Sequence, residues 1–204
     1  MSTSRDRVRQ ALSHQGSDRI PVDFGATAVT GIHCRVVEAL RKPYGLSYTP
    51  VKIVDTFQMV GGVDRDLADA MGVDCIGVGG TRDIFDHDTE CMHEQVTPWG
   101  QKVLVPIQLD LTQDKEGDVY VYAGGDKNYP PSAIMPNGCF FINAIERQQP
   151  IDEDKLNPMD NLEEFNSITD EELDAYKKKV NKASATGRAV VASFGGTALG
   201  DVAF

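Results

Sequence analysis

Four short apolar runs of strand length punctuate the chain, and each predicts a β-strand. These runs are residues 20–23, 51–54, 75–78 and 189–193. Between them, apolar side chains recur at helical spacing behind capping residues such as Ser4, Thr30 and Thr169. Strands that alternate with helices in this way predict an α/β protein built from βα units, with each strand ending in a loop that leads into a helix.

The alternation pauses over residues 81–150, where the pattern predicts an inserted β element. Strands are expected within 96–105 and within 118–122, and a turn is expected at 114–117. Residues 124–138 are rich in Gly, Asn and Pro, so we expect an irregular connection there. The chain therefore reads as one unit, residues 1–204, interrupted by a hairpin region and an irregular segment.

A pentapeptide of the form Phe-Gly-x-Thr-Ala occurs twice, each time directly after an apolar run. The copies are Phe24-Gly25-Ala26-Thr27-Ala28 and Phe194-Gly195-Gly196-Thr197-Ala198. In α/β folds ligands bind at the carboxyl ends of the strands, so both copies stand where such folds bind ligands. Asp23 closes the first run, where it could bind a polar substrate group or cap nearby loop amides.

Composition narrows the function classes. The 204 residues carry a formal net charge of −11, which argues against sequence-independent binding of nucleic acid. No apolar stretch approaches the roughly 20 residues that span a bilayer, and the polar start has no secretory core, so we expect a cytoplasmic protein without membrane contact. The four cysteines are irregularly spaced, which favours reduced, packing thiols over a disulfide framework.

Two local combinations suggest chemistry, and a structural role is the favoured interpretation of each. Cys34 follows His33 in the first turn of a predicted helix, where backbone amides would lower a thiol pKa, yet free cysteines usually pack in cores. Cys91 and His93 would share one face of a strand near His87, but a structural zinc site normally needs four closely spaced ligands. We therefore predict no metal site and assign no catalytic residue.

Several segments together resemble the uroporphyrinogen decarboxylase-like superfamily, with the closer likeness to its cobalamin-dependent methyltransferase branch. The matching segments are residues 5–14, 18–25, 30–33, 55–58, 67–74, 98–106 and 193–197. The resemblance implies a (β/α)8 TIM barrel with its active site at the strand ends. Such a barrel typically needs about 250 residues, and about four barrel strands are expected here. The chain is therefore expected to be the N-terminal part of a longer protein, with the barrel incomplete.

The resemblance implies a corrinoid (cobalamin) as cofactor, and a zinc ion bound by a His-x-Cys pair and a distant Cys that holds a thiol substrate as thiolate. No residue of this chain matches those zinc ligands. The residues expected to shape the cavity for a small-molecule or corrinoid-protein substrate come from three strand-end loops. They are Asp23, Thr27, Thr30, His33, Asp55, Gln58, Phe194 and Thr197.

Three functions follow from these observations. The leading hypothesis is methyl transfer between a corrinoid and a thiol or methylated substrate. Uroporphyrinogen decarboxylation is the second, but it needs cations to hold carboxylates, and no arginine occurs after the first strand until Arg35. The third is a non-catalytic subunit that a partner chain, or a second copy in a homo-oligomer, completes.

Overall fold

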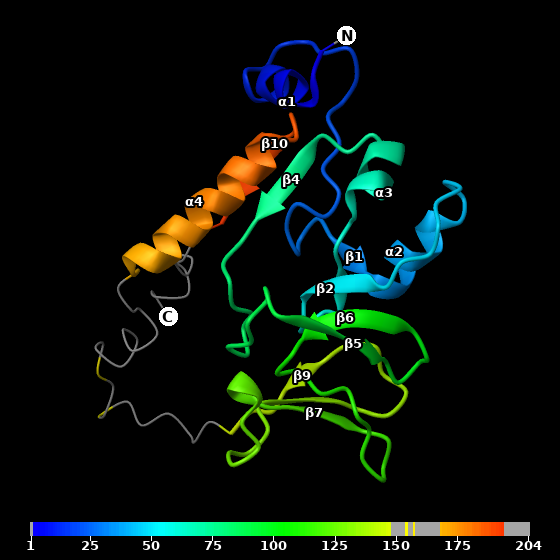
Figure 1. The fold of residues 1–204 in the computed structure, drawn as a ribbon, viewed down its shortest axis with the longest axis vertical. Helices are drawn as coiled ribbons and strands as arrows, with labels where there is room; N and C mark the ends of the chain where they lie inside the picture. The colour runs from blue at the N-terminus through cyan, green and yellow to red at the C-terminus, as the bar shows by residue number, and fades with distance from the viewer. Residues whose placement is uncertain (1, 148–153, 155–156, 158–167, 194–204) are drawn as a thin grey trace.

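The computed structural model describes residues 2–147, 154, 157 and 168–193, and within them the chain is a mixed α/β protein with several sheets and no closed barrel. Its helices are α1 (Ser4–Leu12), α2 (Cys34–Arg41), α3 (Arg65–Ala70) and α4 (Asp170–Ser184), with a 3₁₀ turn η1 (Ala123–Gly125). Its strands are β1 (Ile32–His33), β2 (Val51–Asp55), β3 (Val60–Gly61), β4 (Cys75–Val78), β5 (Met92–Val96), β6 (Lys102–Pro106), β7 (Val119–Val121), β8 (Ala133–Met135), β9 (Asn143–Ala144) and β10 (Ala189–Ala192). Helix α1 lies at one end of the molecule and the sheet that contains β7 at the other (Figure 1).

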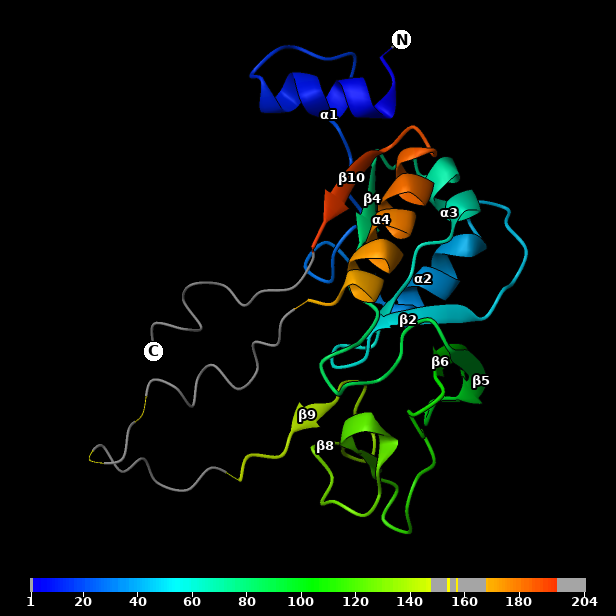
Figure 2. The same cartoon turned by 60° about the vertical axis from the view of Figure 1, so that its left-hand side comes forward.

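Strands β4 and β10 form a parallel pair in which Cys75 faces Ala189 and Val78 faces Ala192. Helix α4 precedes β10 and packs against both strands (Figures 1 and 2). The predicted strand at 20–23 runs beside β4, where the carbonyl of Val22 accepts a hydrogen bond from the amide of Asp74 at 2.7 Å. Residues 20–23 do not form a regular strand, so the prediction of a strand there is not met.

The largest sheet has the order β1-β3-β2-β6-β5 and mixes parallel with antiparallel pairs. Strands β5 and β6 form a hairpin, and β6 runs parallel to β2. Residues 51–54 form a strand and a helix, α3, follows it as expected, but the chain first reverses after β2 and returns antiparallel as β3, which the pattern did not predict. That reversal depends on the Asp55 carboxylate, which accepts the amide of Gln58 at 2.7 Å, and on Met59 with φ of 51°.

The inserted region contains more regular pairing than its composition predicts. Residues 96–105, where a strand was expected, contain a tight turn. In this turn Thr97 and Gln101 exchange hydrogen bonds, and Gly100 takes a φ of 83°. Strand β7 pairs with β8, which lies inside the segment expected to be irregular, and β8 pairs with β9.

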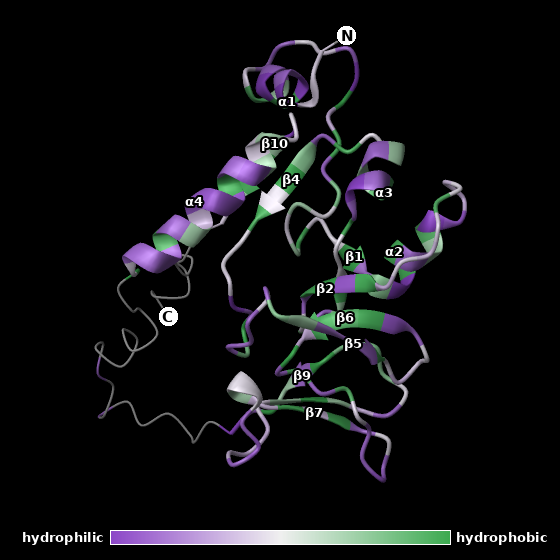
Figure 3. Cartoon of the chain, in the orientation of Figure 1, coloured by the Kyte–Doolittle hydropathy of each residue, from purple (hydrophilic) through white to green (hydrophobic). Residues whose placement is uncertain are grey.

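Buried apolar side chains from both of the larger sheets join in one core, and Figure 3 shows apolar stretches along β2, β4 and β6.

The helices follow their predicted capping chemistry with two shifts. Helix α4 begins with the predicted capping box, in which the Thr169 hydroxyl accepts the amide of Glu172 and the Glu172 carboxylate accepts the amide of Thr169. Helix α1 is capped by Thr3 rather than Ser4. Helix α2 is capped by His33 rather than Thr30. The Thr30 hydroxyl lies instead within hydrogen-bond distance of Thr27, so it does not serve the helix.

Candidate functional site

The first Phe-Gly loop folds back on itself and uses most of its own polar groups. The amide of Gly25 donates to the carbonyl of Thr30 at 2.9 Å, and the hydroxyls of Thr27 and Thr30 lie 3.3 Å apart. The carboxylate of Asp23 accepts the amide of Ala26 at 3.2 Å, and its side chain is exposed. Of the two roles considered for Asp23, the capping role is therefore the one observed.

His33 closes the start of α2 and has both ring nitrogens engaged. Its Nδ1 accepts the backbone amide of Arg35 at 3.3 Å, and its Nε2 lies 3.1 Å from the carbonyl of Phe140. The proton therefore sits on Nε2, which donates to the carbonyl, and the imidazole is neutral. Burial lowers the pKa of His33, which favours the same neutral state. Neither nitrogen is free to bind a metal or to accept a substrate proton.

Three aromatic rings gather around His33 at the surface of the molecule. The His33 ring lies 5.3 Å from Trp99 and 5.4 Å from Phe141, measured between centroids, and Trp99 lies 5.3 Å from Phe140. The Arg35 guanidinium lies 4.6 Å from the Phe140 centroid, a cation–π distance. Phe140 and Phe141 remain 37% and 53% exposed. Sequence reasoning missed Trp99, Phe140 and Phe141 as neighbours of His33, because no local pattern links such distant positions.

The structure brings the first two predicted loops together. Val60 of β3 lies between them in the sheet, opposite His33 on one side and Asp55 on the other. The segment that carries the two exposed phenylalanines then crosses to the second loop, where the amide of Ile142 donates to the carbonyl of Phe57 at 3.0 Å. Gln58 is exposed beside this segment of chain. Phe194 and Thr197 lie outside the described residues.

Cys34 packs in the core and is not a reactive thiol. Its side chain is 0% exposed, and its sulfur lies 3.4 Å from Oε1 of Gln101, which also accepts the indole N–H of Trp99 at 3.0 Å. Burial raises the pKa of Cys34 to about 12. The helix start would lower the thiol pKa, but desolvation outweighs it, so the reactive-thiol alternative is wrong and the packing alternative is confirmed.

The histidines near Cys91 are used elsewhere. His87 is buried against Asp83, and Nε2 of His93 lies 3.3 Å from the carbonyl of Leu109 and 3.0 Å from the amide nitrogen of Gln95. Within the described residues, no group of three or more His, Cys, Asp or Glu side chains could hold a metal ion. The combination of Cys91 with His93 therefore does not extend to a larger ligand set in this part of the chain.

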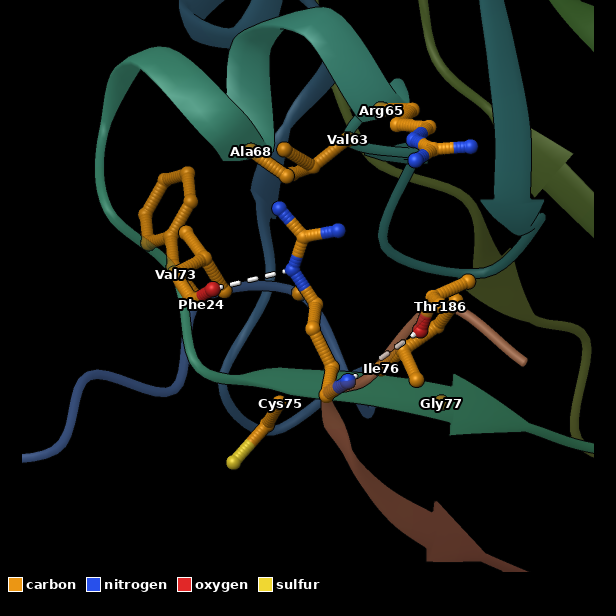
Figure 4. A pocket seen from close by; sticks show the side chains of 11 residues that line it. Phe24, Val63, Arg65, Ala68, Val73, Cys75, Ile76, Gly77 and Thr186 are labelled. Carbon is orange, nitrogen blue, oxygen red and sulfur yellow. Dashed lines mark hydrogen bonds between the residues drawn. The ribbon is translucent and has the colours of Figure 1, made fainter. Parts of the chain in front are cut away.

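A cavity of about 110 Å³ lies between β4, α3 and the start of β10, next to the first Phe-Gly loop (Figure 4). Phe24 and Val63 contribute to its lining, and the Cys75 side chain points to the opposite side of β4. The side chain of Arg188 lines this cavity and already has partners. Its Nε donates to the carbonyl of Val73 at 2.9 Å, and its guanidinium binds Asp69. The cavity is well below the roughly 300 Å³ of a typical ligand pocket, so it does not by itself hold a corrinoid.

Searches of protein-family models, of curated proteins and of solved structures each returned no match to this chain. In the portion of the chain that the structure describes, no helix is long and apolar enough to cross a membrane.

Proposed function

We propose that this chain forms the N-terminal part of a (β/α)8-barrel methyltransferase of the uroporphyrinogen decarboxylase-like superfamily. The observation that carries the proposal is the unit β4-α4-β10, two neighbouring parallel strands joined through a helix that packs on both. Residues 20–23 reach this sheet just before β4, where the amide of Asp74 donates to the carbonyl of Val22. Neighbouring parallel strands that are connected through a packed helix are the repeating unit of such a barrel.

The positions at which β4 and β10 end support a single cavity that is lined by the loops after both strands. Val78 and Ala192 end their strands in register, so the loops after them leave from the same edge of the sheet. The first Phe-Gly loop reaches that sheet at Gly77, where an added Cβ would collide with the carbonyl of Ala26. Asp23, Thr27 and Thr30 would then shape one wall of the substrate cavity through the loop conformation that their hydrogen bonds hold.

The described residues do not themselves fit a zinc ion or a corrinoid. They offer no set of three metal ligands, and the cavity beside the first loop has only about 110 Å³. Chemistry at a corrinoid or a thiolate therefore falls to residues outside those described, and this part of the chain supplies shape and position. His33 fits that role, because both of its nitrogens are occupied by backbone groups.

The test is the reaction of the full-length protein with methylcobalamin as methyl donor and 2-mercaptoethanol as acceptor, under anaerobic conditions with added zinc. Methyl transfer breaks the cobalt–carbon bond, forms a carbon–sulfur bond and leaves both bonding electrons on cobalt, so the methylcobalamin absorbance falls. We expect a protein-dependent fall that Thr27→Val slows and that Lys115→Ala, in the distant 114–117 turn, leaves unchanged. A rate equal to that of the protein-free mixture would refute the proposal.

The founding activity of the superfamily receives less support. A decarboxylase would hold the carboxylates of its substrate with cations after the first strand, and the first arginine there, Arg35, lies over the Phe140 ring.

The hypothesis of a non-catalytic subunit is favoured by one observation. Among the described residues, no strand pairs with the edge of β10 that faces away from β4. Absence of co-elution between this chain and a complementary barrel half would refute the subunit hypothesis.

A further inference from the structure

His87 lies at a junction of three segments of the chain. It belongs to the loop between β4 and β5, and its side chain is 0% exposed. Its Nδ1 lies 3.1 Å from a carboxylate oxygen of Asp83, and its Nε2 lies 2.9 Å from the carbonyl of Tyr122, the residue after β7. The same Asp83 oxygen accepts the hydroxyl of Thr56 at 2.6 Å, which ties the loop to the turn after β2. The imidazole thus connects the largest sheet with the β7-β8-β9 sheet.

Both ring nitrogens of His87 face oxygen atoms that can only accept hydrogen bonds. A neutral imidazole carries one N–H and could serve one of these two acceptors, while its other nitrogen would point a lone pair at an oxygen. Only the imidazolium donates to both. The second oxygen of Asp83 accepts the amides of Phe85 and His87, each at 2.9 Å, so the carboxylate is held in place by its own loop.

The charges around the ring favour the imidazolium. Asp83 binds it directly, and Asp86 of the same loop adds a second negative charge, although Arg82 pairs with Asp86 at 2.8 Å. The turn after β2 contributes a neutral hydroxyl, and the segment after β7 contributes a neutral carbonyl. In that segment, Lys127 is engaged with Asp110 at 2.8 Å. Burial lowers the pKa of His87, but its hydrogen bonds and the carboxylate charges outweigh burial and raise the pKa above its usual value.

We propose that His87 is a proton-dependent latch that fastens the β7-β8-β9 sheet to the largest sheet, and that loss of its proton releases the Tyr122 side. The carboxylate of Asp83 is the stronger acceptor, so the proton that remains stays on Nδ1. Nε2 then presents a lone pair to the Tyr122 carbonyl at hydrogen-bond distance, and that contact becomes repulsive. A second link, from the amide of Gly124 to the carbonyl of Phe85 at 2.8 Å, is then the remaining backbone bond at this junction among the contacts described.

The direction of the pH effect follows from the raised pKa. The contribution of the latch is complete below the ordinary histidine pKa of about 6.5 and is lost as pH rises through the pKa of the closed state. Between these two values, the opening equilibrium of the β7-β8-β9 sheet should rise about tenfold per pH unit. Outside that window it should level off.

The test combines two NMR measurements on the intact protein. The chain has four histidines, so each ring proton signal can be titrated separately. We expect His87 to titrate above about 6.5 and His33 below it. Hydrogen exchange of the β7 and β8 amides, corrected for intrinsic base catalysis, should accelerate over the His87 transition, while the amides of β5 and β6 should not follow it.

Asp83→Asn is the informative variant, because it keeps the side-chain shape and removes the charge. It should lower the His87 midpoint and abolish the pH window in β7 exchange. His14→Asn is the matched control, since His14 is exposed and has a φ of 55° that Asn tolerates, and it should change neither measurement. If Asp83→Asn does not fold, the wild-type data decide alone. A His87 midpoint at or below about 6.5, or β7 exchange that ignores the transition, would overturn the proposal.

Discussion

The buried carboxylate of Asp74 pairs with two arginines, and its removal gives the sharpest test of how the N-terminal segment is held. Its side chain is 0% exposed at the start of β4. It accepts from Arg7 at 2.5 Å, from Arg19 at 2.7 Å and from the amide of Val22 at 2.9 Å. These contacts join α1 and the extended segment at 20–23 to the parallel pair of strands.

Asp74→Asn keeps the shape of the side chain but leaves two guanidinium groups without their shared counter-charge. Removing one partner of a buried ion pair costs about 3–5 kcal/mol of unfolding free energy. Arg7 retains Asp18 at 2.8 Å and Arg19 is 40% exposed, so the lower end of that range, about 3 kcal/mol, is expected. For a domain of this size, that corresponds to a fall in Tm of roughly 6–12 °C.

Urea unfolding at pH 7, followed by circular dichroism, measures this loss. Asp174→Asn is the control, because Asp174 forms an exposed ion pair with Lys177 and its removal should leave the midpoint unchanged. A cost for Asp74→Asn below about 1 kcal/mol would contradict the reasoning, since that is the value of a surface pair.

The pH dependence adds a second readout for the same residue. Burial opposes ionisation of Asp74, but its hydrogen bonds outweigh burial and hold its pKa below the usual value. Its contribution to stability is therefore present above the unfolded pKa of about 3.9 and is lost as pH falls through the folded pKa. Asp74→Asn should remove that part of the acid sensitivity. An unchanged acid transition in the variant would show that other carboxylates dominate it.

Three further predictions test separate features. Gly77→Ala should destabilise by about 1–3 kcal/mol in thermal unfolding, because its new methyl meets the first Phe-Gly loop, whereas Gly79→Ala, with open space around it, should be nearly neutral. Cys34, which is buried and has its pKa raised to about 12, should resist iodoacetamide at pH 8 in the folded protein, while the exposed Cys139 reacts, as peptide mass mapping would show. Thr169→Ala should cost about 1 kcal/mol of unfolding free energy by removing the α4 capping box.

Local signals predicted the helices well, because capping and periodicity act over a few residues. The capping box at Thr169 and the helix that follows it needed no knowledge of distant contacts. Helix α3 likewise ends just before Gly72, whose φ of 67° is a conformation that favours glycine after a helix. The pairing partners of the strands were harder to predict from the sequence. The run at 51–54 is a strand as expected, but an apolar run alone does not say whether a helix or a reverse turn follows it.

The candidate site was only partly predictable for the same reason. Asp23, Thr27 and Thr30 lie in one short loop, so their proximity could be read from the chain. That their polar groups bind each other, rather than face an open cavity, depends on the loop conformation. The ring cluster around His33 draws on positions near residues 99 and 140, and it forms only when the inserted region folds back over the start of α2.

Two histidines bind backbone carbonyls at opposite ends of the β7-β8-β9 sheet. His87 holds the carbonyl of Tyr122 after β7, and His33 holds the carbonyl of Phe140 just before β9. Burial keeps the pKa of His33 low, so its neutral ring continues to donate through Nε2 at the pH where His87 loses its second donor. Release at one end with retention at the other makes the sheet pivot about the segment beside His33. The pH-dependent exchange should therefore be larger in β7 than in β9.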